Sequence, residues 1–172
     1  MVARSVVVMG VSGSGKSTIG LLLSKRTDGH FRDGDRLHPD ENVRKMAEGI
    51  PLTDDDRLPW LRAIGEHLQR GQERGTDEVV ACSALKRSYR DLLREYVPDL
   101  YVVFLDGPLQ LIRERVNARS HEFMPTTLLE SQFAALEPLT PDEHGCRVSI
   151  QDPPEQIVDQ IVAAMSVPAG ER

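Results

Sequence analysis

The 172-residue sequence has few cysteines, few aromatic residues and no long apolar run. Two cysteines are too few for a framework of disulfides, and no second cysteine pair suggests a zinc site, so we expect reduced thiols and a cytoplasmic protein. No apolar stretch approaches the roughly 18 residues that span a bilayer. The N-terminal residues also lack the apolar segment of a signal peptide, so we expect no membrane partner.

Basic residues are too few for a nucleic-acid partner. There are 21 lysines and arginines against 27 aspartates and glutamates, the net charge is -6, and no basic tail or basic face is visible. The hydrophobic fraction of 40% and the charged fraction of 28% are ordinary for a folded protein. At this length we expect one domain over residues 1–172, large enough to bury a sizeable core.

A glycine-rich segment follows the apolar run Ser5–Met9 and matches the pattern G-x-x-x-x-G-K-[ST]. A strand before this pattern and a helix after it are typical of a phosphate-binding loop, in which glycines let backbone N–H groups face phosphate oxygens. We expect Lys16 to reach the β- and γ-phosphates of ATP and Ser17 to ligate Mg²⁺. The alternative is a glycine-rich turn without a ligand, but such a match rarely arises by chance. The expected nucleotide-binding residues are Gly10, Val11, Ser12, Gly13, Ser14, Gly15, Lys16, Ser17 and Thr18.

Five short apolar runs predict buried parallel strands, and helical patterns lie between them. The expected strands are Ser5–Met9, Gly29–Arg32 running into Asp33, Glu78–Cys82, Leu100–Leu105 and Arg147–Ile150. The expected helices are Lys16–Arg26, Pro39–Glu48, Pro59–Arg74, Lys86–Tyr96, Pro108–Arg119, Thr126–Leu136 and Pro154–Met165. This alternation predicts an α/β fold, a three-layer P-loop NTPase sandwich around a five-stranded parallel sheet. The segment at about 119–140 interrupts the alternation, and we expect it to form a helical lid.

Two aspartates follow the second expected strand, at the edge of the sheet where ligands bind. Asp33 and Asp35 flank Gly34, so in an extended segment their side chains point the same way, and the glycine permits close approach of the backbone. Beside a phosphate loop, one carboxylate can hold Mg²⁺ through water and the other can accept a proton from an attacking hydroxyl. The alternative is an ordinary Asp-Gly-Asp turn.

An acidic run precedes the third expected helix. Asp54, Asp55 and Asp56 repel one another, but a helix N-terminus favours negative charge, and capping by Asp55 or Asp56 explains the run most simply. Arg57 beside them suits the carboxylate or phosphate of a ligand. Trp60 is the only tryptophan, and we expect it to anchor a helix on the substrate side.

Basic residues cluster on two expected helices. Lys86, Arg90 and Arg94 recur every four residues. This stripe is either a solvated face or, at Lys86 and Arg90, a site for an anionic substrate. Arg115 and Arg119 share one face at a helix end, where two guanidinium groups suit the charge on a transferring phosphoryl group. The alternative for the second pair is two surface arginines.

His38 and Asp106 also lie where ligands bind in such sheets. His38 follows the aspartate pair and either contacts substrate hydroxyls or caps the next helix, and the sequence leaves both open. Asp106 ends the fourth strand, as a Walker-B aspartate would. Asp33 lies closer to the expected position of a hydroxyl acceptor, so Asp106 is secondary.

Four segments together resemble the thermoresistant-type gluconokinases, in the group of small P-loop kinases that includes the shikimate and adenylate kinases. They read GVSGSGKST, DGDRLHPDENVRKMAEGIPLTDDDRLPWL, CSALKRSYRDLLR and FMPTTLLESQFAALEP, and span most of residues 6–138. The second segment is long and specific to this family, whereas the first names only the superfamily. The family often has His-Phe-Met or His-Phe-Phe in the lid, but here Glu122 precedes Phe123. No role is therefore carried over to His121.

The resemblance implies ATP-dependent phosphorylation of D-gluconate to 6-phospho-D-gluconate, with a mobile lid and a homodimer. In this mechanism Asp35 orients or deprotonates the terminal hydroxyl of gluconate, and Asp33 supports Mg²⁺ through water. Lys16, Arg115 and Arg119 neutralise charge on the phosphoryl oxygens. The candidates for binding gluconate itself are His38 at a hydroxyl and, at the carboxylate, Arg57, Lys86 and Arg90.

Two other functions stay open at this point. One is a kinase for shikimate or another polyol acid, which a panel of acceptors would distinguish. The other is a nucleotide-dependent regulatory protein that hydrolyses ATP slowly and forms ADP without any sugar acid. The acid pair and the basic cluster favour a kinase, because both follow strand ends, where a small acceptor would lie.

Overall fold

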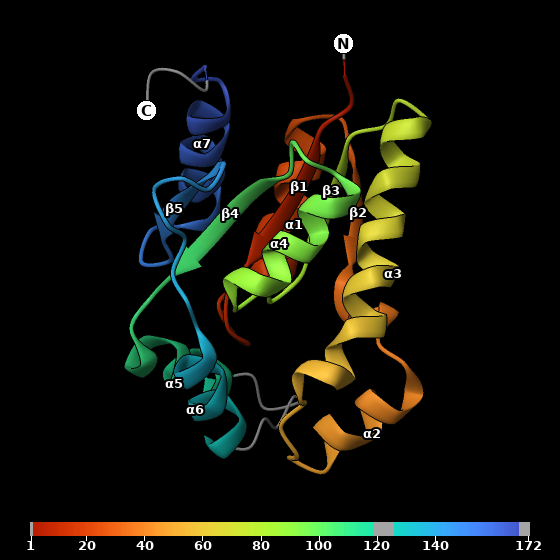
Figure 1. The fold of residues 1–172 in the computed structure, drawn as a ribbon. Coiled ribbons are helices and arrows are strands. Elements are labelled where there is room, and N and C mark those ends of the chain that lie inside the picture. The colour runs from red at the N-terminus through yellow and green to blue at the C-terminus, as the bar shows by residue number, and fades with distance from the viewer. Residues whose placement is uncertain (1, 119–125, 169–172) are drawn as a thin grey trace.

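A computed structural model describes residues 2–118 and 126–168, in which strands and helices follow one another along the chain (Figure 1). The strands are β1 (Ser5–Met9), β2 (His30–Asp33), β3 (Glu78–Ala81), β4 (Tyr101–Asp106) and β5 (Gly145–Ser149). The helices are α1 (Lys16–Arg26), the 3₁₀-helix η1 (Gly34–Leu37), α2 (Asp40–Ala47), α3 (Asp54–Glu73), α4 (Arg87–Tyr96), α5 (Leu109–Ala118), α6 (Thr126–Ala135) and α7 (Pro154–Met165). The expected strands and helices are present, with the predicted ends in β1, α1 and α7 and with shifted ends in the others.

All five strands pair in parallel, in the order β2-β3-β1-β4-β5. The central strand β1 is buried throughout, as its run of valines predicts for a strand that is covered on both faces. The next two strands along the chain, β2 and β3, lie on one side of β1, and the last two, β4 and β5, lie on its other side. The strand order therefore reverses beside β1, and open α/β sheets bind their ligands at such a reversal.

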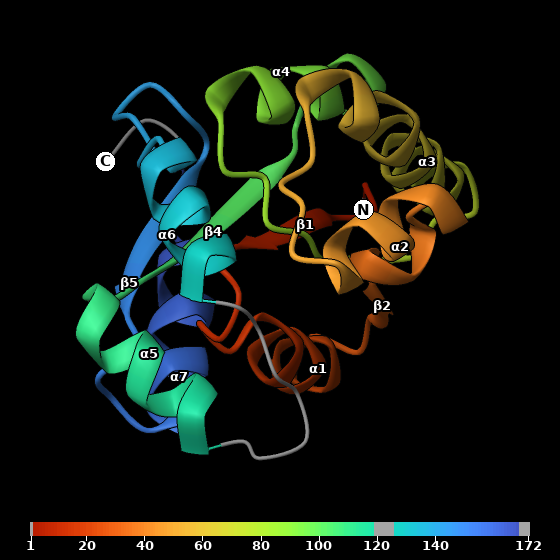
Figure 2. The ribbon, with the colours of Figure 1, turned by 90° about the horizontal axis from the view of Figure 1, so that it is seen from below.

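Helices cover both faces of the sheet, and the period-2 alternation of a strand assigns side chains to each face. Val6 and Val8 of β1 pack in one core cluster with side chains of α1 and α7, and Val7 and Met9 pack in a second with side chains of α3 and α4. Figure 2 shows α3 and α4 on one side of the strands and α1 and α7 on the other. The predicted three-layer α/β sandwich with a five-stranded parallel sheet is confirmed.

Helix α3 begins earlier than predicted, because a capping box starts it. The Thr53 hydroxyl accepts from the N–H of Asp56 at 3.1 Å, and the Asp56 carboxylate accepts from the N–H of Thr53 at 2.9 Å. Thr53 is thus the N-cap, and the expectation that Asp55 or Asp56 caps this helix is wrong. Pro59 lies inside α3 rather than in its first turn.

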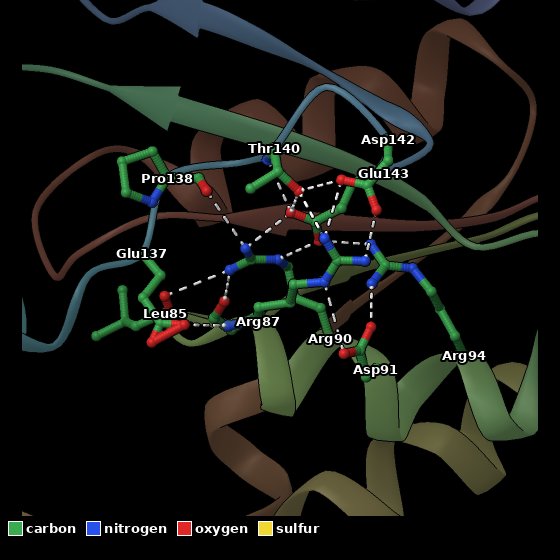
Figure 3. Close-up of polar contacts among 11 residues, drawn as sticks. Leu85, Arg87, Arg90, Asp91, Arg94, Glu137, Pro138, Thr140, Asp142 and Glu143 are labelled. Carbon is green, nitrogen blue, oxygen red and sulfur yellow. Dashed lines mark hydrogen bonds and ion pairs between the residues drawn. The ribbon is translucent and has the colours of Figure 1, made fainter.

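The basic stripe on α4 is not a solvated face. Arg90 is fully buried, and its guanidinium donates to both oxygens of Glu143, at 2.7 and 2.9 Å (Figure 3). Other N–H groups of Arg90 donate to the carbonyls of Ala84 and Leu85, and Arg94 donates to the same Glu143 carboxylate at 2.7 Å. The stripe therefore joins α4 to the segment before β5 and to the loop after β3.

The expected lid at about 119–140 lies partly outside the described residues, which omit 119–125. Its described part includes α6, where Leu128 and Leu129 are buried. Beyond α6, the N–H of Glu137 donates to the carbonyl of Leu85 at 2.8 Å. Within residues 2–118 and 126–168, no helix has the length and apolar character needed to cross a membrane.

Replacing Glu143 by glutamine is expected to destabilise the protein strongly, because Arg90 would keep a buried charge without its counter-ion. Breaking a buried ion pair in this way costs about 3–5 kcal/mol. Urea unfolding followed by the fluorescence of Trp60 measures this loss. The control is Asp142→Asn, since Asp142 pairs with Arg87 at the surface and should lose much less. Equal losses in the two variants would contradict the assignment.

The same carboxylate makes stability depend on pH. Burial alone would raise the pKa of Glu143, but hydrogen bonds from Arg90, the Thr140 N–H and Arg94 outweigh it and lower the pKa to about 2. Because the unfolded chain titrates at about 4.5, it binds more protons than the folded protein between these values. Stability should fall as pH drops from about 4.5 to about 2, and this part of the loss should be missing in E143Q.

Candidate active site

The loops that follow β1, β2 and β3 line a pocket of about 680 Å³, together with parts of α2, α3 and α6. Figure 2 views the molecule from this end, where α2 and α6 lie beyond the carboxyl ends of the strands. The pocket therefore lies where the strand order predicts a ligand site. Its lining includes polar side chains from each of the three loops: Ser12, Lys16, Ser17, Asp35, His38 and Ser83.

The glycine-rich loop joins β1 to α1 with the backbone geometry of a phosphate cradle. Gly13 and Gly15 have φ values of +81° and +98°, and a Cβ at Gly13 would collide with Val116. Helix α1 starts at Lys16 with no side-chain cap at Gly15, so its positive N-terminal end faces the loop. The Ser14 hydroxyl is buried without a hydrogen-bond partner among the residues described. These features fit the phosphates of ATP.

Lys16 extends across this loop. Its Nζ donates to the carbonyl of Val11 at 3.0 Å. Burial lowers the pKa of Lys16, and the negative charges of Asp35 and Asp33 oppose that shift. The lysine therefore lies within electrostatic reach of both aspartates that follow β2.

The two aspartates are not equivalent, because the chain bends between them. Asp33 ends β2 and caps η1, its carboxylate accepting from the N–H of Asp35 at 3.0 Å. Asp35 lies inside η1 and lines the pocket. The expectation of an extended segment here is wrong. Gly34 does permit a close approach, since a Cβ there would collide with the carbonyl oxygen of Ala81.

Protein atoms around the pocket shift the acidity of Asp35. Desolvation raises the pKa of this carboxyl, the positive charge of Lys16 opposes the rise, and the charge of Asp33 adds to it. The side chain still meets solvent through the pocket that it lines. Asp35 can therefore accept a proton from a group bound there more readily than an ordinary surface aspartate.

Trp60 is buried and anchors α3, the structural part of what the sequence predicts for it. The buried indole N–H donates to the carbonyl of Gly34 at 2.8 Å, which ties α3 to the loop after β2. His38 stacks on this indole, with ring centroids 4.1 Å apart and an interplanar angle of 16°. Burial, then the charge of Arg57, lowers the pKa of His38 to about 4, so the ring is neutral at neutral pH.

Of the three cations expected at a substrate carboxylate, Arg57 lines the pocket. Its guanidinium donates to the carbonyl of Leu52 at 2.6 Å and lies 5.5 Å from the centre of the Tyr89 ring. Lys86 is not part of the described lining, and its Nζ pairs with Asp54 at 3.1 Å. The Tyr89 hydroxyl donates to the same Asp54.

Arg90 does not reach the pocket. Its buried guanidinium is already engaged by Glu143 and by the carbonyls of Ala84 and Leu85, so a substrate carboxylate could bind only after these bonds break. The expectation that Arg90 binds the substrate is wrong for this reason. The residue instead supports the loop after β3, in which Leu85 lines the pocket.

The two arginines assigned to the phosphoryl group have different positions. Arg115 lines a second, smaller pocket of about 190 Å³ with Ser14, Gly15 and Asp152, and its guanidinium donates to the carbonyl of Ile150 at 2.6 Å. Arg115 and Asp35 thus line different pockets. Arg119 lies outside the described residues.

Sequence reasoning missed Gln132 on α6. Its side-chain carbonyl accepts from the N–H of Ser12 at 2.7 Å, and its amide donates to the Ser12 hydroxyl at 3.1 Å. Gln132 thereby joins α6 to the phosphate loop. A single uncharged glutamine in a helical segment has no distinctive spacing or charge, so no pattern in the sequence signals this contact.

Comparison with known proteins places these features in a family. The family model described as an AAA domain matches residues 6–139. The thermosensitive gluconokinase of Escherichia coli (strain K12) is 40% identical over 161 residues, which cover 93% of this chain and 86% of the relative.

Solved structures agree with the sequence comparison. A crystal structure of a gluconokinase from Sinorhizobium meliloti 1021 has a TM-score of 0.87 and 48% identity, covering 95% of this chain and 91% of that one. An unliganded sugar kinase from Janibacter sp. HTCC2649 has a TM-score of 0.92 and 44% identity, covering 98% and 97%. With this identity over nearly its whole length, the chain belongs to the AAA-domain family and, within it, to the gluconokinases.

Proposed function

We propose that this protein transfers the γ-phosphoryl group of ATP to the 6-hydroxyl of D-gluconate, giving 6-phospho-D-gluconate and ADP. One observation carries the proposal: Lys16 of the phosphate loop and the carboxyl of Asp35 line the same pocket. A phosphoryl donor held by the first can meet a hydroxyl held by the second. The similarity to gluconokinases supports D-gluconate as the acceptor.

The donor side consists of the phosphate loop and the start of α1. Backbone N–H groups of the loop would hold the phosphates, and the Lys16 ammonium would neutralise charge on the γ-phosphoryl oxygens. The Ser17 hydroxyl at the start of α1 would ligate Mg²⁺, with Asp33 supporting the ion through water. Bound Mg²⁺ supplies charge neutralisation between the phosphates. The smaller pocket beside Arg115 is the proposed place for the nucleotide's base side, because it shares Gly15 and Thr18 with the larger one.

The acceptor side consists of the loop after β2 and the start of α3. Asp35 would orient the 6-hydroxyl and accept its proton, a role that its raised pKa favours. Arg57 would bind the gluconate carboxylate, since its planar guanidinium suits that group. His38 would contact one of the acceptor's oxygens.

The proposal also covers the cellular compartment and the oligomeric state. Neither Cys82 nor Cys146 forms a disulfide, which supports a reducing compartment, the cytoplasm. The pKa of the Cys82 thiol is raised to about 12 by burial, which keeps it protonated and unreactive. The resemblance to the gluconokinase family supports a homodimer.

An acceptor panel tests the substrate. We expect ADP release in a coupled assay to require added D-gluconate, with shikimate and other polyol acids giving much lower kcat/KM. The physical reason is that Arg57 and Asp35 line the same pocket, so a good acceptor would have to reach the first with its carboxylate and the second with its terminal hydroxyl. ADP formation that does not depend on any added sugar acid would instead indicate a nucleotide-hydrolysing regulatory protein.

Replacing Asp35 by asparagine should lower kcat by roughly 10²–10⁴-fold, the range for loss of a general base. The KM for gluconate should change far less, because an amide can still hydrogen-bond the hydroxyl. Steady-state kinetics with ATP and gluconate measure both. Asp55→Asn is the matched control, since Asp55 is an exposed carboxylate outside the pocket lining. Near-normal turnover of D35N would remove Asp35 from the chemistry.

A further inference from the structure

We propose that Asn42 holds His38 as the neutral tautomer with its proton on Nε2, so that His38 can only donate a hydrogen bond to the substrate. The substrate part of this inference rests on the proposed function. Asn42 is a buried residue of α2 that the mechanism above does not use. Its role follows from the hydrogen-bonding capacity of each group that it meets.

The orientation of the Asn42 amide is fixed by a backbone carbonyl. Its Nδ2 lies 2.8 Å from the carbonyl oxygen of Asp56, and a carbonyl oxygen can only accept. Turning the amide over would place two oxygens in contact and leave buried polar groups unpaired. The –NH₂ group of Asn42 therefore points toward Asp56.

The same –NH₂ group meets the histidine ring. Nδ2 of Asn42 lies 3.3 Å from Nδ1 of His38, and both of its hydrogens are then used, one for Asp56 and one for His38. Since the amide nitrogen is a donor, Nδ1 must be the acceptor and cannot carry a proton. A neutral imidazole has one N–H, so the proton lies on Nε2.

The surroundings of the ring disfavour the doubly protonated form. An imidazolium would turn Nδ1 into a donor that faces the Asn42 donor. Burial and the positive charge of Arg57 act in the same direction and lower the pKa of His38 to about 4. Stacking on Trp60 at 4.1 Å fixes the plane of the ring. The Nε2–H therefore has a set direction.

A donor-only histidine restricts what the pocket recognises. His38 lines the pocket, and its Nε2 has no hydrogen-bond partner within residues 2–118 and 126–168. It would donate to an oxygen lone pair of the sugar acid and could not take a proton from a hydroxyl. The base role then falls to Asp35, and Asn42 acts as a positioning residue that sets the polarity of this contact.

NMR of the ring nitrogens tests the tautomer directly. Two-bond ¹H–¹⁵N correlation spectra of the ¹⁵N-labelled full chain, without substrate, should show His38 at neutral pH with a protonated Nε2 and an unprotonated Nδ1. The signals that disappear in His38→Gln identify the residue. An Nδ1–H pattern, an averaged pattern of two tautomers or an imidazolium pattern would overturn the inference.

Variants of Asn42 link the tautomer to binding. Asn42→Asp replaces the donor by an acceptor and should move the proton to Nδ1, and Asn42→Ala, which buries no charge, should give averaged tautomers. Loss of one hydrogen bond should raise the KM for gluconate by roughly 2- to 10-fold with a smaller change in kcat. Glu41→Gln, an exposed change on the same helix, should leave both spectrum and kinetics unchanged. Unchanged gluconate KM in a folded N42A with averaged tautomers would also overturn the inference.

The two proposals fail separately. The spectrum of the free protein needs no reaction, so a failure of gluconate phosphorylation leaves the tautomer assignment standing. An active gluconokinase whose His38 carries its proton on Nδ1 would remove this inference and leave the proposed function intact.

Discussion

The hydrogen bond from the indole of Trp60 to the carbonyl of Gly34 holds together the wall of the pocket that α3 and the loop after β2 form. It ties α3, which covers one face of the sheet, to the loop after β2. Gly34, which accepts the bond, lies between the two aspartates of that loop. The position of Asp35 depends on that loop, and the plane of His38 depends on the indole on which it stacks. A single buried contact thus links the loop that carries Asp35, the ring of His38 and the helix that carries Arg57.

Charged residues in this protein divide according to what surrounds them. Arg90 and Glu143 are buried and satisfy each other, and their role is to hold α4, the loop after β3 and the segment before β5 together. Arg57 carries the same guanidinium group as Arg90, but it lines the pocket. Because a guanidinium binds a carboxylate of the protein as well as that of a ligand, residue type alone does not separate the two roles.

Much of the fold was predictable, because parallel strands buried on both faces appear as continuous apolar runs such as Ser5–Met9. Element ends were predictable only where a local signal dominates. Helix α1 begins where the glycine-rich loop ends, whereas α3 begins at a capping box that the acidic run Asp54–Asp56 does not distinguish from simple charge–dipole capping. The bend that separates Asp33 from Asp35 was missed, since an Asp-Gly-Asp segment is compatible with both extended and turn geometry.

By itself, the sequence determined the order of strands and helices, the phosphate loop and the family, because each depends on residues close together in the chain. Tertiary structure alone decided which of Arg57, Lys86 and Arg90 lines the pocket, and that Gln132 meets Ser12 across 120 positions. Which partner each of these side chains binds depends on groups that lie far away in the sequence. A guanidinium or an amide binds whichever acceptors folding brings within about 3 Å, and no local pattern records them.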